Sequence, residues 1–184
     1  MEKKILFQGE EIGRALNRMA HEVLELKEAP ANLILVGIRS RGGHLVRRMA
    51  RAIEAKTGRA PDLATIDVTA FRDDIDRPEQ AKEPPPVDAA ISVDEKTVVL
   101  VDDVINTGRT VRAALSLLSR LGKPKRVIVA ALVDRGNREL PLRADIVGKN
   151  VQVGDSERVN VLVQEYDGID QVTVTPRSSA QGKK

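Results

Sequence analysis

Hydrophobic positions along the chain follow two kinds of spacing, one typical of helices and one typical of strands. Apolar side chains three and four residues apart predict amphipathic helices at Glu10–Lys27, Leu45–Lys56 and Arg109–Leu121. Short apolar or alternating runs bounded by turn residues predict strands at Leu33–Ile38, Leu63–Phe71, Thr97–Val101, Val127–Val133, Ile146–Val151 and Val159–Tyr166, with Gln171–Thr175 pairing with the last of them. Because strands and helices alternate, the pattern predicts an α/β fold with a mostly parallel, twisted sheet between helices.

Two segments have no hydrophobic period. Residues 72–87 are charged and end in three prolines, which predicts a long loop, and such loops in compact domains are usually functional or disordered. Residues 176–184 are polar and are predicted to form a disordered tail. Since no repeat is present, residues 1–175 are expected to form a single domain.

Composition restricts the classes of function. A chain of 184 residues with 41% hydrophobic and 31% charged side chains fits one globular domain. No apolar run approaches the roughly 18 residues that span a bilayer, and the first residues lack a signal-peptide pattern, so we expect a cytoplasmic protein without a membrane partner. The absence of cysteine excludes disulfides and thiol nucleophiles. A net charge of +3 permits a nucleic-acid partner, whereas 2% aromatic residues argue against a base-stacking platform.

The strongest chemical signal lies where the strand at 97–101 runs into two adjacent carboxylates, Asp102 and Asp103. The next helix opens with a turn that we call the phosphate turn, made of Asn106, Thr107, Gly108, Arg109 and Thr110. Unpaired N–H groups and the helix dipole at a helix amino end favour an anion, and a glycine lets the backbone approach it closely. Carboxylates can accept hydrogen bonds from sugar hydroxyls or hold a divalent metal. The stretch therefore predicts a site for a phosphorylated sugar.

A second turn, which we call the arginine turn, precedes the helix at 45–56. It consists of Arg39, Ser40, Arg41 and Gly42. The planar guanidinium fork suits phosphate, although arginines are also common in surface turns that bind nothing. Both turns follow strands of one parallel sheet, and ligands bind beyond the carboxyl ends of such strands. One site for a 5′-phosphate and one for a pyrophosphate describe a single ligand, phosphoribosyl pyrophosphate (PRPP).

The segment 98–110 resembles the ligand-binding motif of the type I phosphoribosyltransferases. Four further stretches are similar to the PyrR family of bifunctional pyrimidine-operon attenuation proteins and uracil phosphoribosyltransferases, namely residues 16–22, 35–42, 66–74 and 132–151. The similarity extends from Ile12 to Val163 and is most specific at residues 134–145, DRGNRELPLRAD. It implies the reaction of uracil with PRPP to give UMP and pyrophosphate, with Mg²⁺ as cofactor. It also implies UMP-dependent binding to a hairpin in leader mRNA, which promotes transcription termination.

The resemblance implies roles for individual residues. The phosphate turn, Asp102 and Asp103 would bind PRPP or nucleotide, with the two aspartates as candidate Mg²⁺ ligands. The arginine turn would bind pyrophosphate. The flexible loop over the site would begin with Arg72, Asp73 and Asp74. The base would lie among Asp134, Ile146, Val147 and Gly148.

RNA would contact a basic face shared between subunits of a homodimer or larger homo-oligomer. The residues implied in that face are Arg18, His21, Arg138 and Lys149. On spacing alone, a solvated helix face explains the basic residues between positions 14 and 21 equally well.

Asn106 stands where relatives have a tyrosine, and where the purine enzymes have an aspartate proposed as general base. An amide cannot take a proton at neutral pH, so no catalytic base is assigned. We therefore hypothesise that transferase activity is weak relative to nucleotide binding. Two alternatives stay open: a nucleotide-sensing RNA-binding regulator without useful catalysis, and a plain phosphoribosyltransferase for another base.

Overall fold

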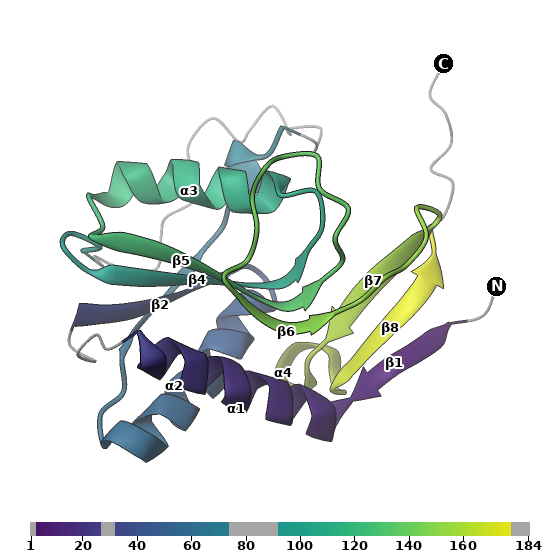
Figure 1. The fold of residues 1–184 in the computed structure, drawn as a ribbon, viewed down its shortest axis with the longest axis horizontal. Helices are drawn as coiled ribbons and strands as arrows, with labels where there is room; N and C mark the ends of the chain where they lie inside the picture. The colour runs from purple at the N-terminus through teal and green to yellow at the C-terminus, as the bar shows by residue number, and fades with distance from the viewer. Residues whose placement is uncertain (1–2, 27–31, 74–91, 178–184) are drawn as a thin grey trace.

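The computed structural model describes residues 3–26, 32–73 and 92–177. Their central feature is a five-stranded, all-parallel sheet in the order β3-β2-β4-β5-β6. The strands are β3 (Asp62–Ile66), β2 (Leu33–Ile38), β4 (Thr97–Ile105), β5 (Arg126–Asp134) and β6 (Ile146–Asn150). Helix α3 (Arg109–Leu121) covers one face, and α1 (Gly9–Glu25) and α2 (Gly42–Thr57) cover the other (Figure 1). The predicted α/β class is confirmed.

The central strands are apolar on both faces because both faces are covered by helices. In β2, Leu33 and Leu35 pack into the core beneath α1 and α2, whereas Ile34 and Val36 pack into the core beneath α3. All six residues of β2 are buried. This two-sided burial explains why the run at 33–38 shows no polar alternation.

A second, antiparallel sheet lies beyond the carboxyl ends of the parallel strands (Figure 1). It has the order β1-β8-β7, with β1 (Lys4–Gln8), β8 (Gln171–Pro176) and β7 (Glu157–Leu162). The expected pairing of the last two strands is confirmed. Strand β1 is an addition to the sequence prediction, because only Phe7 of its five side chains is buried and the pattern is too short to detect.

Several element boundaries differ from the sequence prediction. Helix α2 begins at Gly42, three residues early, because its glycines pack closely against β2, β3 and β4. Strand β4 continues to Ile105, since its ladder with β5 extends to Asp134. The chain leaves β7 after Leu162 and forms the short helix α4 (Gln164–Asp167).

The predicted strand at Leu63–Phe71 ends at Ile66, and residues 69–71 form a 3₁₀ turn. Pro176, the expected start of the tail, is the last residue of β8 and pairs with Glu157 of β7. Positions 74–87 of the predicted loop and 178–184 of the predicted tail lie outside the described residues. No helix in the described ranges is long and apolar enough to cross a bilayer.

Candidate functional site

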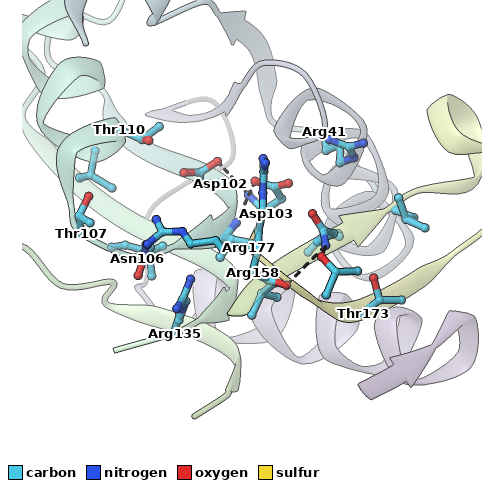
Figure 2. A pocket seen from close by; sticks show the side chains of 18 of the residues that line it. Arg41, Asp102, Asp103, Asn106, Thr107, Thr110, Arg135, Arg158, Thr173 and Arg177 are labelled. Atoms are coloured by element: carbon cyan, nitrogen blue, oxygen red, sulfur yellow. Dashed lines mark hydrogen bonds between the residues drawn. The ribbon is translucent and has the colours of Figure 1, made fainter. Parts of the chain in front are cut away.

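A cavity of about 1170 Å³ opens between the carboxyl end of the parallel sheet and the small antiparallel sheet (Figure 2). Its lining includes Asp102, Asp103 and most of the phosphate turn on one side, and Arg39 and Arg41 of the arginine turn on another. Polar side chains of β7 and β8 close it from the small sheet. The fold therefore brings the two predicted turns and the carboxylate pair into one site.

The phosphate turn is built for close approach of a ligand to backbone. Gly108 caps α3 with a φ of 92°, a left-handed conformation that disfavours a side chain. Thr107 and Thr110 line the cavity beside it. Arg109 does not line it, because its guanidinium binds Glu139 at 2.7 Å and Asp73 at 3.1 Å. The turn thus offers hydroxyls and the amino end of α3, while Arg109 tethers it to neighbouring segments.

The segment after β5 holds the phosphate turn in place from outside the cavity. The N–H groups of Glu139 and Leu140 both donate to the carbonyl oxygen of Thr107 at 3.0 Å. Arg138 donates from Nη1 to the carbonyl oxygen of Asn106 at 2.8 Å. Its other nitrogens bind the Leu142 carbonyl at 2.7 Å and Asp134 at 2.6 Å. The stretch that resembles the PyrR family most specifically is therefore a clamp on the phosphate turn.

This geometry favours a structural role for Arg138 over the expected RNA contact. Its side chain is only 17% exposed, and every guanidinium nitrogen has an acceptor within the protein. A guanidinium committed to internal partners is poorly placed to contact RNA. We assign Arg138 to support of the phosphate turn.

The carboxylates of Asp102 and Asp103 both reach the cavity from the end of β4 (Figure 2). Asp102 accepts a hydrogen bond from the Asp103 N–H at 3.0 Å, and Asp103 accepts one from the Val104 N–H at 2.9 Å. Burial, followed by the negative charge of Asp103, raises the pKa of Asp102 well above its usual value. Burial also raises the pKa of Asp103, although its hydrogen bond with Asp102 opposes this. Two adjacent like charges, one buried and one half-buried, favour a cation or hydroxyl donors.

The arginine turn lies across the cavity from the phosphate turn. Arg41 forms a two-point ion pair with Asp167 of α4, at 2.9 and 2.7 Å, and Arg39 lies 3.9 Å from Asp67. Ser40 and Gly42 do not line the cavity, although Gly42 backs directly onto the carbonyl oxygen of Val101. The two arginines are thus the parts of this turn that face a ligand.

A Gly37→Ala variant tests the packing behind the arginine turn. A Cβ at Gly37 would lie 2.5 Å from the carbonyl carbon and oxygen of Gly42, so β2 and α2 must separate. We expect a loss of about 1–3 kcal/mol in the free energy of unfolding, measured by urea denaturation. Gly13→Ala is the control, because nothing lies within 4 Å of that Cβ in the middle of α1. It should gain about 0.5–1 kcal/mol, and equal behaviour of the two variants would contradict the packing.

The expected base-binding residues do not line the cavity. Ile146 and Val147 begin β6 and pair with Ala130 and Ala131 of β5, before the carboxyl ends of the two strands. Gly148 packs closely against Leu132 and the sulfur of Met19. Asp134 is occupied by Arg138 and by the N–H of Gly136 at 2.8 Å. These four residues therefore do not contribute to the cavity lining, and their role in base binding stays a prediction.

Sequence reasoning missed a group of polar residues that line the other side of the cavity: Lys3, Arg135, Arg158, Asn160, Thr173, Thr175 and Arg177. Asn160 donates to the Thr175 hydroxyl at 3.0 Å, so the two strands present one polar face. The sequence pattern that could have identified these residues is the alternation of polar residues with buried valines in β7 and β8. That alternation is also typical of a solvated sheet face, so only the tertiary fold identifies it as part of a site.

The remaining predicted residues belong to the start of the expected flexible loop and to the expected RNA surface. Arg72 lines the cavity, Asp73 forms ion pairs with Arg109 and Arg112 at 3.1 Å, and Asp74 lies outside the described residues. The basic residues of α1 and β6 sit away from the cavity lining, where α1 packs on β6.

That basic face is held together by contacts between α1 and the strands beside it. Arg18 donates to the carbonyl oxygens of Val147 and Gly148. Lys149 lies 3.6 Å from Glu11 and stacks over a phenylalanine ring of β1. His21 Nδ1 lies 2.7 Å from the carbonyl oxygen of Asn17 and is otherwise exposed. The three predicted RNA contacts other than Arg138 therefore stay on one outer surface.

Comparison with known proteins agrees with this geometry. Residues 3–166 match the phosphoribosyl transferase domain. The chain is 49% identical to the bifunctional protein PyrR of Chloroflexus aurantiacus, over 94% of each chain. It is 44% identical to the bifunctional protein PyrR of Limosilactobacillus fermentum, over 94% of this chain and 97% of the relative. Among solved structures, the hypoxanthine phosphoribosyltransferase of Trypanosoma cruzi has the same fold, with a TM-score of 0.72 at 18% identity over 94% of this chain and 96% of that one.

Proposed function

Because this chain belongs to the PyrR family, we propose that it joins uracil to PRPP to form UMP, and that it binds leader mRNA of pyrimidine genes in response to UMP. One observation carries the proposal. A single cavity presents an anion-binding helix start, a pair of arginines and a pair of carboxylates, which match the 5′-phosphate, the pyrophosphate and the ribose hydroxyls of PRPP. The transferase half is tested by measuring UMP and pyrophosphate formed from uracil and PRPP.

The geometry supports a separate role for each group of residues in the cavity. Thr107, Thr110 and the amino end of α3 hold the 5′-phosphate, and Asp102 and Asp103 hold the ribose hydroxyls. Uracil N1 forms a bond to the anomeric carbon as the bond from that carbon to pyrophosphate breaks. Arg39 and Arg41 then stabilise the negative charge on the leaving pyrophosphate. The positive charge that develops on the ribose faces the carboxylate pair.

Mg²⁺ fits the carboxylate pair. Asp102 is buried, the adjacent Asp103 is half-buried, and both are raised in pKa; oxygen ligands of this kind suit a hard divalent cation. They would hold the ion together with oxygens of PRPP. Bound Mg²⁺ supplies positive charge that neutralises the pyrophosphate oxygens.

The RNA half of the proposal rests on the outer face of α1 and β6. Arg18, His21 and Lys149 lie there, and we propose that they contact the leader hairpin. The leader transcript is made in the cytoplasm, which is where we place the protein. A homodimer or larger homo-oligomer would extend the basic face across two subunits.

Gel-shift titrations with the leader hairpin test this surface. We expect UMP to raise the affinity and rising salt to lower it, because phosphate contacts release counterions. Arg18→Gln and Lys149→Gln should each weaken binding and reduce the salt slope by about one. Lys123→Gln is the control, since that exposed side chain follows α3 on the opposite side of the sheet. Affinity that ignores both UMP and salt would rule out regulatory RNA binding.

A regulator without useful catalysis is the second candidate, and Asn106 favours it. The amide stands in the phosphate turn where a general base would act, and it cannot take a proton. Tight UMP binding without UMP formation would select this candidate.

A further inference from the structure

Three arginines gather on the side of the cavity next to Asn106 (Figure 2). Arg135 follows β5, Arg158 lies on β7 and Arg177 follows β8, and we call them the arginine triad. None of the three forms an ion pair with a carboxylate in the described ranges 3–26, 32–73 and 92–177. The triad therefore places several positive charges on one wall without a bonded protein anion.

Arg135 is the most constrained of the three. It is only 5% exposed, and Nη2 donates to the carbonyl oxygen of Gly154 at 2.9 Å. Its Nε is buried and has no hydrogen-bond partner. Burial, followed by the positive charge of Arg177, lowers its pKa, although the negative charges of Asp155 and Glu157 oppose this. A buried donor left unpaired is costly, so a side-chain rotation that brings this group to an acceptor on a ligand would be favourable.

A hydrogen-bond acceptor without a partner lies in the segment beside Arg135. The Oδ1 atom of Asn106 is buried without a hydrogen-bond partner. The N–H of Arg135 donates to the carbonyl oxygen of Ile105 at 3.0 Å, which holds Arg135 beside the residue that precedes Asn106. The ring edge of a pyrimidine offers both a carbonyl oxygen and an N–H group. Arg135 Nε and Asn106 Oδ1 are both closed to solvent in the ligand-free protein, so the two side chains must turn toward the cavity to meet that edge.

The positive charge of the triad indicates whether the bound pyrimidine is neutral or anionic. The phosphate and the pyrophosphate of PRPP already face the phosphate turn and the arginine turn. A neutral pyrimidine needs no further cation, and neighbouring guanidiniums repel one another when nothing lies between them. Three arginines at the remaining end of the cavity therefore indicate a negatively charged partner there.

We propose that the arginine triad binds uracil as its N1-deprotonated anion, so that the reaction needs no general base at position 106. The proposal rests on the uracil transferase function given above. Nearby positive charges favour the charged form of an acid and so lower the pKa of the uracil N1–H. The proton leaves N1 for bulk water when uracil binds. The N1 electron pair then attacks the anomeric carbon, and the electron pair of the broken C–O bond leaves with pyrophosphate.

The first test compares uracil with 5-fluorouracil, whose ring N–H is more acidic. Arg135→Gln should lower kcat/KM for uracil about 10²-fold, the usual effect of removing one electrostatic donor, and for 5-fluorouracil only about tenfold. Arg135→Lys should retain more activity than Arg135→Gln because it keeps the charge. Arg158→Gln and Arg177→Gln, whose side chains are exposed, should show the same preference for 5-fluorouracil without loss of folding. Arg126→Gln, at the opposite end of β5, is the matched control and should change neither value.

A second test does not depend on turnover. The ultraviolet spectrum of uracil bound to the wild-type protein at pH 7 should match that of the uracil anion. A neutral spectrum, or equal losses with the two bases in all three glutamine variants, would overturn the proposal. Preference for a pyrimidine carboxylate over uracil would overturn it as well, because the triad would then bind a substituent. An anion spectrum without UMP formation would instead overturn the transferase function and leave the proposal standing.

Discussion

An Asp102→Asn variant is expected to be more stable than the wild-type protein at pH 7 and almost inactive. Asp102 is 5% exposed, and burial together with the charge of Asp103 raises its pKa. Removing that buried charge should increase the free energy of unfolding by about 1–3 kcal/mol, the usual cost of an uncompensated buried polar group. Nucleotide formation should fall by about 10²–10³-fold, because a preorganised charge at the ribose is lost. Function and stability thus oppose each other at this position.

The stability difference between Asp102→Asn and the wild-type protein should depend on pH. A carboxyl whose folded pKa lies above its unfolded value stabilises the fold below about pH 3.9, and this stabilisation is lost as the pH rises through the folded pKa. The stability difference between Asp102→Asn and the wild type should therefore be small near pH 4 and should grow toward neutrality. Guanidinium denaturation of the ligand-free proteins across this range measures it.

A surface carboxylate provides the control for that series. Asp62 is exposed and pairs with Lys96, so Asp62→Asn should change the free energy of unfolding by less than about 0.5 kcal/mol at any pH. A variant Asp102→Asn that is less stable than wild type at pH 7 would contradict the strained carboxylate pair.

An Arg138→Gln variant is expected to lose about 2–4 kcal/mol of stability, because one partner of a largely buried ion pair disappears. The carbonyl oxygens of Asn106 and Leu142 lose a donor in the same change. The phosphate turn should loosen, and UMP affinity should fall about tenfold, roughly one charged hydrogen bond. Denaturation and calorimetric titration with UMP measure the two effects.

Arg143→Gln is the matched control, since that arginine lies five residues further along the same segment and is exposed. It should leave stability and UMP affinity unchanged. If Arg138→Gln keeps both and loses only RNA affinity, then the RNA role implied by resemblance is correct and the clamp is wrong.

Local patterns were sufficient for most of the fold. The predicted bounds of β2 and α3 match the structure because an apolar run in the first and a glycine at each end of the second mark their limits. The start of α2 was misplaced because glycines usually break helices, whereas here Gly42 and Gly43 allow the helix to approach neighbouring strands. Such an approach depends on tertiary packing, which no local pattern records.

The candidate site also contains some residues that local patterns predict and others that depend on tertiary packing. The shared location of the phosphate turn, the arginine turn and the carboxylates could be predicted because each lies at or just after the carboxyl end of a strand, and parallel strands end at one edge. The polar wall formed by β7 and β8 could not, since its alternating pattern is also typical of a solvated sheet face. The arginine triad comes from three separate segments, and only the fold of the small sheet over the cavity brings them together.

The most direct test of the central claim is the product formed from PRPP and Mg²⁺ with a panel of bases. Uracil, hypoxanthine and guanine are supplied separately to the purified protein, and nucleotide and pyrophosphate are quantified together. We predict UMP and an equal amount of pyrophosphate with uracil, and no nucleotide with either purine. A purine nucleotide, or tight UMP binding without any UMP formation, would contradict a uracil phosphoribosyltransferase.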